Sequence, residues 1–208
     1  MSDDQNKKRV WDPYIPEPFL SKVAQQRESP QITRNSALLV IDLYNLVFEG
    51  GNRSLHEDGL LDRFPATCGE KAYQAIQPTN QLIGLFRDNG LPIFFSTKDF
   101  EQSQKDGNAT LRPRKIAKAE DYQIFPEIDF RPTDNLVKKL RASIFFNTGL
   151  NDHLANLNVE SLFIAGESTS GCIRASVVDA FSLGYQVCLV EDCVFDQNPV
   201  SHAVNLYD

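Results

Sequence analysis

The chain has no long hydrophobic run and no excess of positive charge. A membrane-spanning helix needs about 18 or more consecutive apolar residues, and no such run occurs among its 208 residues. Residues 1–8 are polar and lack the apolar core of a signal peptide. Lys and Arg number 21 against 28 Asp and Glu, which gives a net charge of −7. Nucleic acids and anionic membranes bind basic surfaces. We therefore expect neither as a partner, and we expect a cytoplasmic protein.

Metal-binding patterns are missing as well. His56, His153 and His202 are the three histidines, and none belongs to an HxH or HExxH motif. The four cysteines, Cys68, Cys172, Cys188 and Cys193, do not have the spacing of a zinc site. No glycine-rich phosphate loop is present. We therefore expect no metal and no cofactor, and in a reducing compartment we expect no disulfide bonds.

The chain divides into an N-terminal arm and one domain. Residues 1–35 contain four prolines, which interrupt regular structure. The arm also carries six apolar residues, so we expect it to pack on the body of the domain or on a neighbouring subunit: Val10, Trp11, Tyr14, Ile15, Phe19 and Leu20. Residues 36–208 are of a normal size for a single domain.

Apolar runs alternate with helical patterns along residues 36–208. Strands are predicted at 37–41, 91–96, 135–138, 161–166 and 186–190, and helices at 72–89, 149–157, 175–183 and from 199 onward. This alternation predicts an α/β fold of three layers, a doubly wound parallel sheet of the Rossmann type. Pro78 is interpreted as a first turn or a break in its helix. The long polar segment 98–133 is interpreted as a lid or a pocket wall.

Three predicted strands end at reactive residues: Asp42, Lys139 and Cys172. The carboxyl ends of parallel strands meet at one edge of the sheet, which is where such folds bind ligands. Cys172 also lies just before a predicted helix, whose positive dipole end favours a thiolate. An ammonium at Lys139 would lower the pKa of the thiol further, and Asp42 would take and return its proton. The pattern indicates a cysteine nucleophile.

Other interpretations of the same residues stay open at this point. A serine-hydrolase order of Ser170, Asp192 and His202 can be imagined, although the GxSxG motif is not satisfied. A redox thiol protein would need Cys193 as the resolving cysteine, and no CxxC motif joins it to Cys172. A catalytically inactive binding or scaffold protein on the same fold is the remaining alternative.

Three segments together resemble the isochorismatase-like cysteine hydrolases. They are residues 38–42 followed by Asn45, residues 139–148, and the stretch from Gly166 to Ala180 with Gly184, Tyr185, Glu191 and Asp192 beyond it. The runs 141–143, 170–174 and 205–208 are most similar to the N-carbamoylsarcosine amidase and maleamate amidohydrolase group. The resemblance covers roughly residues 36–208.

The resemblance implies an isochorismatase-like domain in which Asp42, Lys139 and Cys172 form a catalytic triad. It also implies a cis peptide bond between Glu167 and Ser168, with an oxyanion hole formed by the N–H groups of Ser168 and Cys172. Ser168 stands where threonine is more usual. The family further implies a homo-oligomer, a dimer or a tetramer. Because the chain ends inside a helical pattern, we expect additional C-terminal structure beyond Asp208.

The resemblance also guides the expectation about substrate. Relatives that act on carboxylate-bearing amides have an arginine where this chain has Gln197, which cannot neutralise a carboxylate. The metal site of nicotinamidase relatives is absent after Lys98, and Cys172 argues against the vinyl-ether hydrolysis of relatives that lack the cysteine. We expect a small amide, carbamoyl or ureide compound as substrate. Asn45, Lys98 and Gln197 are the predicted substrate-binding residues.

Overall fold

The computed structural model of the chain describes residues 8–24, 31–106 and 117–208. Expectations for residues 1–7, Pro30 and Pro113 lie outside the described residues. None of the helices in the described ranges combines the length and apolar character that a membrane span requires.

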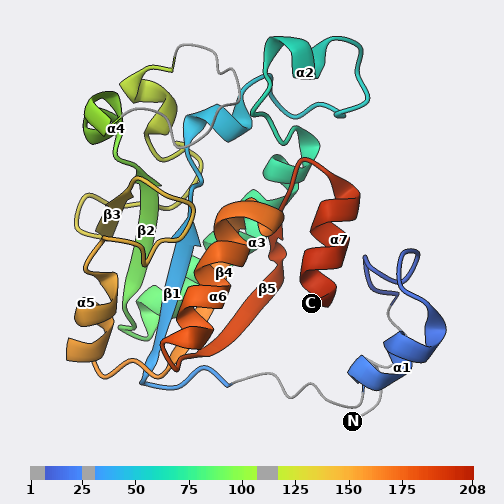
Figure 1. Cartoon of the computed structure of the whole chain (residues 1–208). Helices are drawn as coiled ribbons and strands as arrows, with labels where there is room; N and C mark the ends of the chain where they lie inside the picture. The colour runs from blue at the N-terminus through green and yellow to red at the C-terminus, as the bar shows by residue number, and fades with distance from the viewer. Residues whose placement is uncertain (1–7, 25–30, 107–116) are drawn as a thin grey trace.

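A five-stranded parallel sheet forms the centre of the domain (Figure 1). Its strands are β1 (Ser36–Ile41), β2 (Ile93–Lys98), β3 (Asn135–Lys139), β4 (Ser161–Glu167) and β5 (Gln186–Phe195). Their order in the sheet is β3-β2-β1-β4-β5, and every neighbouring pair is parallel. The chain leaves β1 toward β2 on one side and later places β4 on the other side. The carboxyl ends of β1 and β4 therefore flank the point where the strand order reverses, which is the usual ligand position in such sheets.

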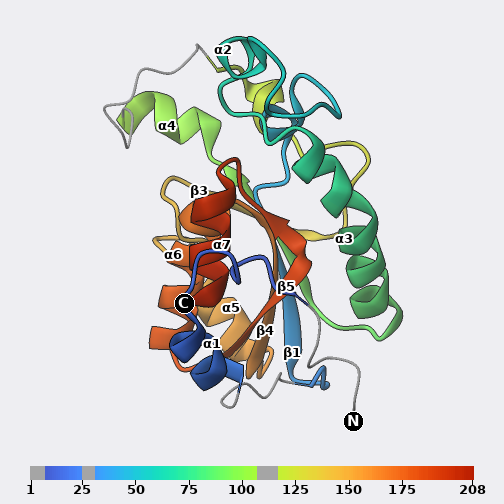
Figure 2. The same cartoon turned by 90° about the vertical axis from the view of Figure 1, so that its right-hand side faces the viewer.

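Helices cover both faces of this sheet (Figure 2). The α-helices are α1 (Glu17–Ala24), α2 (Leu60–Arg63), α3 (Glu70–Asp88), α4 (Phe100–Asp106), α5 (Leu150–Asn156), α6 (Arg174–Ser182) and α7 (Pro199–Tyr207). Two short 3₁₀ helices, η2 (Asn45–Phe48) and η3 (Ala119–Tyr122), and one π-helical turn, η4 (Thr169–Ile173), complete the described elements. Figure 2 shows α3 on one side of the sheet and α5, α6 and α7 on the other.

Successive residues of β1 enter two separate hydrophobic cores. Leu39 and Ile41 pack with α5, α6 and α7, whereas Leu38 and Val40 pack with α3. All six residues of β1 are buried, as expected of a central strand covered on both faces. The three-layer α/β fold predicted from the sequence is confirmed.

Two of the predicted elements differ from the structure. Pro78 does not break its helix, because α3 runs without interruption from Glu70 to Asp88. One lost backbone hydrogen bond is tolerated there, since α3 is fixed to the sheet by four buried residues on one face: Ala72, Ala75, Ile83 and Phe86. β5 continues to Phe195 rather than ending at Val190, with an irregular register opposite Ile164 and Gly166. A bulge of this kind leaves the extra residues of β5 unpaired while the strand continues beyond them.

The arm packs on the domain through part of its apolar set. Trp11 is buried in the core that contains α5, α6 and α7, and Ile15 and Leu20 pack against the same core. Val10, Tyr14 and Phe19 remain exposed. Packing of the arm on its own domain is therefore confirmed for Trp11, Ile15 and Leu20.

Candidate functional site

Asp42 follows β1 directly and is almost completely buried, with 1% of its surface exposed. Its backbone has φ = 58°, a left-handed conformation that residues other than glycine rarely adopt. Oδ1 accepts a hydrogen bond of 2.8 Å from the hydroxyl of Ser96, and Oδ2 accepts one of 2.6 Å from the Nζ of Lys139. The carboxylate is thus held in one orientation by the ends of β2 and β3.

Lys139 ends β3, which is separated from β1 by β2. Neighbouring strands lie about 4.8 Å apart, so its long side chain must cross the end of β2 to reach Asp42. Its Nζ also donates to the carbonyl oxygens of Arg141 and Ala142, at 3.2 and 3.1 Å. Residues 141–143 thus form a loop that folds back after β3, and its carbonyl oxygens surround the ammonium of Lys139.

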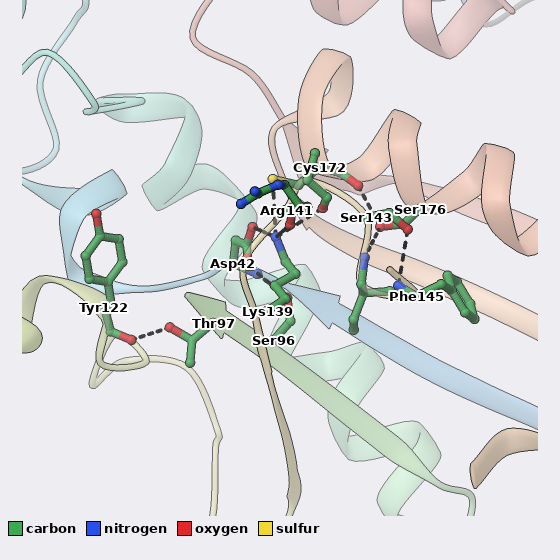
Figure 3. A network of polar contacts seen from close by, with 12 residues as sticks. Asp42, Ser96, Thr97, Tyr122, Lys139, Arg141, Ser143, Phe145, Cys172 and Ser176 are labelled. Atoms are coloured by element: carbon green, nitrogen blue, oxygen red, sulfur yellow. Dashed lines mark hydrogen bonds and ion pairs between the residues drawn. The ribbon is translucent and has the colours of Figure 1, made fainter. Parts of the chain in front are cut away.

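The thiol of Cys172 meets the same ammonium from the other side. Cys172 lies on the π-helical turn η4 between β4 and α6, and its Sγ is 3.5 Å from the Nζ of Lys139. Figure 3 shows Asp42, Lys139 and Cys172 converging from three different segments of the chain. The hydroxyl of Ser176, one helical turn later, donates to the carbonyl oxygen of Cys172 and accepts from the N–H of Ile144. This hydroxyl joins α6 to the loop after β3.

The peptide bond between Glu167 and Ser168 is cis, as the resemblance implied. In the turn that follows, the N–H groups of Gly171 and Ile173 both donate to the carbonyl oxygen of Ser168. A Cβ added to Gly171 would lie 2.5 Å from the hydroxyl oxygen of Ser168. A side chain immediately before the cysteine would therefore require the hydroxyl of Ser168 to move.

The electrostatics of the thiol differ from the expectation. Burial, with a smaller contribution from Asp42, raises the pKa of the Cys172 thiol well above its ordinary value, and Lys139 only partly opposes this shift. Burial alone would lower the pKa of Lys139, but Asp42 and Cys172 together raise it. At neutral pH the site therefore holds a thiol beside a lysine–aspartate ion pair, and not the preformed thiolate predicted from the helix dipole. A base must remove the thiol proton during attack.

Side chains near the end of β5 anchor the cysteine turn. Asp196 accepts hydrogen bonds from both the N–H and the hydroxyl of Ser170, at 2.8 and 2.7 Å. The hydroxyl of Thr169 donates to the carbonyl oxygen of Phe195 and lies 2.8 Å from Nδ1 of His202. Ser170 and His202 thus contact different partners, and the order Ser170, Asp192, His202 of a serine hydrolase is not assembled.

The three predicted substrate-binding residues are each engaged by the protein. Asn45 on η2 donates to the carbonyl oxygen of Glu120, and Lys98 lies 3.4 Å from the hydroxyl of Tyr122 and over its ring. Gln197 donates its amide N–H groups to the carbonyl oxygens of Pro65 and Thr67. These contacts hold the segments around the site together.

A cavity of about 340 Å³ lies between the end of β2, α4, β3 and residues 119–130, and none of Asp42, Lys139 and Cys172 is among the residues that line it. Lys98, Phe100, Tyr122 and Ile124 are among the residues that line it. Thr97 fixes this wall by donating to the carbonyl oxygen of Tyr122 (Figure 3). The position of α4 and η3 at this edge is compatible with the pocket wall predicted for the segment.

Three residues with clear positions in the site were missed in the sequence. Ser96 orients Asp42, Asp196 anchors the cysteine turn, and Glu167 ends β4 next to the cis bond. A polar residue at the end of an apolar strand was the available signal for Ser96 and Glu167. Asp196 gave no such signal, because β5 continues past the position where its apolar run ends. Across the described ranges, no group of three or more His, Cys, Asp or Glu is placed to hold a metal ion.

Comparison with known proteins identifies the family. Residues 36–207 match the isochorismatase domain. The chain is 44% identical over 140 residues to a maleamate amidohydrolase of Pseudomonas putida, covering 64% of this chain and 66% of that protein. It is 27% identical over 156 residues to an N-carbamoylsarcosine amidase of an Arthrobacter species, covering 69% of this chain and 58% of that protein. The matches thus span less than two thirds of these two relatives.

Among solved structures, an isochorismatase family protein of Desulfovibrio vulgaris superposes with a TM-score of 0.68 at 23% identity. That match covers 84% of this chain and 88% of the other. The domain match and the shared architecture agree, and the chain belongs to the isochorismatase family.

Proposed function

We propose that the protein is a cysteine amidohydrolase that cleaves the C–N bond of a small amide, carbamoyl or ureide compound. One observation carries this proposal: the Lys139 ammonium lies 2.6 Å from the Asp42 carboxylate and 3.5 Å from the Cys172 sulfur. A nucleophile, a base and a fixed cation are thereby within reach of one carbonyl group. The names of the two relatives, a maleamate amidohydrolase and an N-carbamoylsarcosine amidase, support the same class of reaction.

In the first half of the reaction, the sulfur of Cys172 attacks the substrate carbonyl carbon while Asp42 takes the thiol proton. The raised pKa of the thiol makes this proton transfer necessary at neutral pH. The N–H groups of Ser168 and Cys172 stabilise the oxyanion that forms. The C–N bond then breaks, Asp42 returns its proton to the departing nitrogen, and a thioester remains on Cys172.

In the second half, Asp42 takes a proton from water as the hydroxide adds to the thioester carbon. The C–S bond breaks, the acid product leaves, and the proton returns to sulfur. Lys139 keeps its charge throughout, because Asp42 and Cys172 raise its pKa. Its role is to offset the negative charge that passes between the carboxylate and the sulfur.

We propose that the substrate lacks a carboxylate group. A maleamate amidohydrolase acts on an amide that carries a carboxylate, and in this chain Gln197 has its amide nitrogen engaged by Pro65 and Thr67. Gln197 therefore supplies neither a charge nor a free donor for such a group. We infer an uncharged amide, carbamoyl or ureide compound as the substrate.

The test is ammonia release from a panel of amides, carbamoyl amino acids and ureides, with maleamate included. The wild type should release ammonia from at least one member, and the Cys172→Ala variant should lose about 10³-fold or more of that activity. Normal turnover by Cys172→Ala would rule out the thioester route. No ammonia from any member, with the folded wild type, would favour an inactive binding protein.

A further inference from the structure

His202 contacts the turn that carries Cys172, and the proposed mechanism assigns it no part. It lies on α7, and its Nδ1 is 2.8 Å from the hydroxyl oxygen of Thr169, the first residue of η4. Thr169 is 1% exposed, and in the sequence it stands between Ser168 and Cys172, whose N–H groups are the proposed oxyanion donors. A hydrogen bond to Thr169 therefore acts on the backbone that joins these two donors.

The contacts of the Thr169 hydroxyl determine which nitrogen of His202 carries the proton. This hydroxyl donates to the carbonyl oxygen of Phe195 at 3.0 Å, and a hydroxyl has only one hydrogen to donate. It must therefore accept in its contact with His202, so the ring donates from Nδ1. Because burial lowers the pKa of His202, the ring is neutral at neutral pH and has a single N–H. Thr169 engages that N–H.

The helix that carries His202 is itself fixed. Asn198 caps the start of α7 by accepting hydrogen bonds from two backbone N–H groups. Ala203 and Leu206, on the same helix, are buried in the core that contains α5 and α6. The donor is thus placed by a packed helix and not by a loop, which is the condition for holding another group in a precise position.

The other end of η4 carries the nucleophile. The Sγ of Cys172 lies 3.5 Å from the Nζ of Lys139, and attack requires the sulfur and both oxyanion donors to face one carbonyl group. A shift of the turn would move all three together relative to the substrate. Misplacement of reacting groups by about 1 Å can cost about 100-fold in rate. A bond that restrains Thr169 therefore bears directly on kcat.

We propose that His202 is a positioning residue, whose Nδ1–H group holds Thr169 and thereby keeps Cys172 and the oxyanion donors aligned for attack. This inference rests on the proposed function for the reaction that Cys172 performs. It goes beyond that function in assigning part of the alignment of the nucleophile to α7, which contributes no member of the triad.

The first test compares substitutions that keep or remove the donor. His202→Asn places an amide N–H near the position of Nδ1, whereas His202→Leu introduces a side chain of almost the same shape without a donor. His202→Gln is polar, but its amide extends to the position of Nε2. With an amide that the wild type hydrolyses, kcat should fall about tenfold in His202→Leu and His202→Gln and stay within about twofold in His202→Asn, and KM should change less than kcat.

The matched control is His153→Leu, the same substitution on α5, where the ring contacts Phe94 and not the cysteine turn. Its kcat should equal that of the wild type. Equal values of kcat in His202→Asn and His202→Gln would overturn the proposal, and this comparison remains decisive even if His202→Leu does not fold.

The second test does not require any hydrolysis. Iodoacetamide alkylates each cysteine at a rate that peptide mass spectrometry resolves. Burial raises the pKa of the Cys172 thiol, so its alkylation depends on local opening of the turn. In His202→Leu and His202→Gln the rate at Cys172 should rise about fivefold or more, because one hydrogen bond fewer opposes that opening. The rates at Cys68 and Cys193, which are buried outside the turn, should not change.

The two tests separate the inference from the proposed function. An unchanged rate at Cys172, or an equal rise at all three buried cysteines, would overturn the positioning role even if amide hydrolysis were established. A rise confined to Cys172 and reversed in His202→Asn would support the role even if no amide were cleaved.

Discussion

The buried ion pair between Asp42 and Lys139 allows a quantitative prediction about stability. The two side chains are 2% and 5% exposed, and Nζ and Oδ2 are 2.6 Å apart. Coulomb's law with an effective dielectric constant of about 20 gives about 6 kcal/mol of attraction at that separation. Much of this attraction offsets the cost of removing two charges from water, so the pair contributes far less in net terms.

Breaking the pair from one side should nevertheless be costly. Lys139→Met retains the length of the side chain but leaves a buried carboxylate without its cation, which costs about 3–5 kcal/mol. It also leaves the carbonyl oxygens of Arg141 and Ala142 without their shared donor. Asp42→Asn leaves a buried ammonium and should cost a similar amount. The double variant leaves no unpaired charge, so its cost should be smaller than the sum by about 2–3 kcal/mol.

Urea unfolding of the wild type, both single variants and the double variant at neutral pH measures this coupling, provided that the m-values agree. The matched control is the exposed pair of Arg53 and Glu57, whose side chains are 46% and 44% exposed at a separation of 3.1 Å. Its coupling should stay below about 0.5 kcal/mol. Additive costs at Asp42 and Lys139, equal to the control within error, would refute the view that the pair is electrostatically coupled.

Three other predictions concern single side chains. Glu167→Gln should remove a pH dependence of stability. The native carboxyl has a pKa of about 8 against an ordinary value of 4.5. As pH rises between these two values, the free energy of unfolding of the wild type should therefore fall by up to about 1.4 kcal/mol per pH unit. In urea unfolding, the stability of the variant relative to the wild type should increase between pH 4.5 and 8 and stay level above pH 8. A difference between the two proteins that does not change with pH would contradict the raised pKa. Asp196→Ala removes two charge-assisted hydrogen bonds to Ser170 and should lower the free energy of unfolding by about 2 kcal/mol. It should also lower kcat more than it raises KM. An unchanged kcat would show that the cysteine turn needs no anchor. Phe181→Glu changes an apolar residue of α6 that is 75% exposed, and sedimentation should show a smaller assembly if the expected homo-oligomer buries this face. The control is Leu85→Glu, whose side chain is 47% exposed on α3 across the sheet and which should leave the mass unchanged. An oligomer unaffected by Phe181→Glu would exclude α6 from the interface.

Much of the site could be predicted because it depends on where strands end. Asp42, Lys139 and Cys172 each follow or close a strand, and parallel strands bring their carboxyl ends to one edge whatever their order in the sheet. The hydrophobic periodicity of the sequence does not reveal the order of the strands in the sheet. That order, β3-β2-β1-β4-β5, places Lys139 two strands away from Asp42. Only a long side chain connects those positions, and Ser96 on the strand between them completes the contact.

The remaining differences arise from tertiary packing. Pro78 lies inside α3 because the buried face of that helix outweighs one missing backbone bond. The pKa of Cys172 was expected to fall from the helix dipole and from Lys139, but burial beside Asp42 raises it. Burial and neighbouring charge depend on residues distant in the sequence, and no local pattern contains them.

The central claim is that Cys172 forms a covalent bond to the acyl part of an amide substrate. Intact-protein mass spectrometry on enzyme quenched during turnover tests it most directly, with peptide mapping to locate any added mass. The account predicts an acyl adduct on Cys172 that appears before the product acid, is absent in Cys172→Ala, and disappears when the amide is exhausted. Ammonia release at full rate with no adduct at any time, and at the same rate in Cys172→Ala, would contradict it.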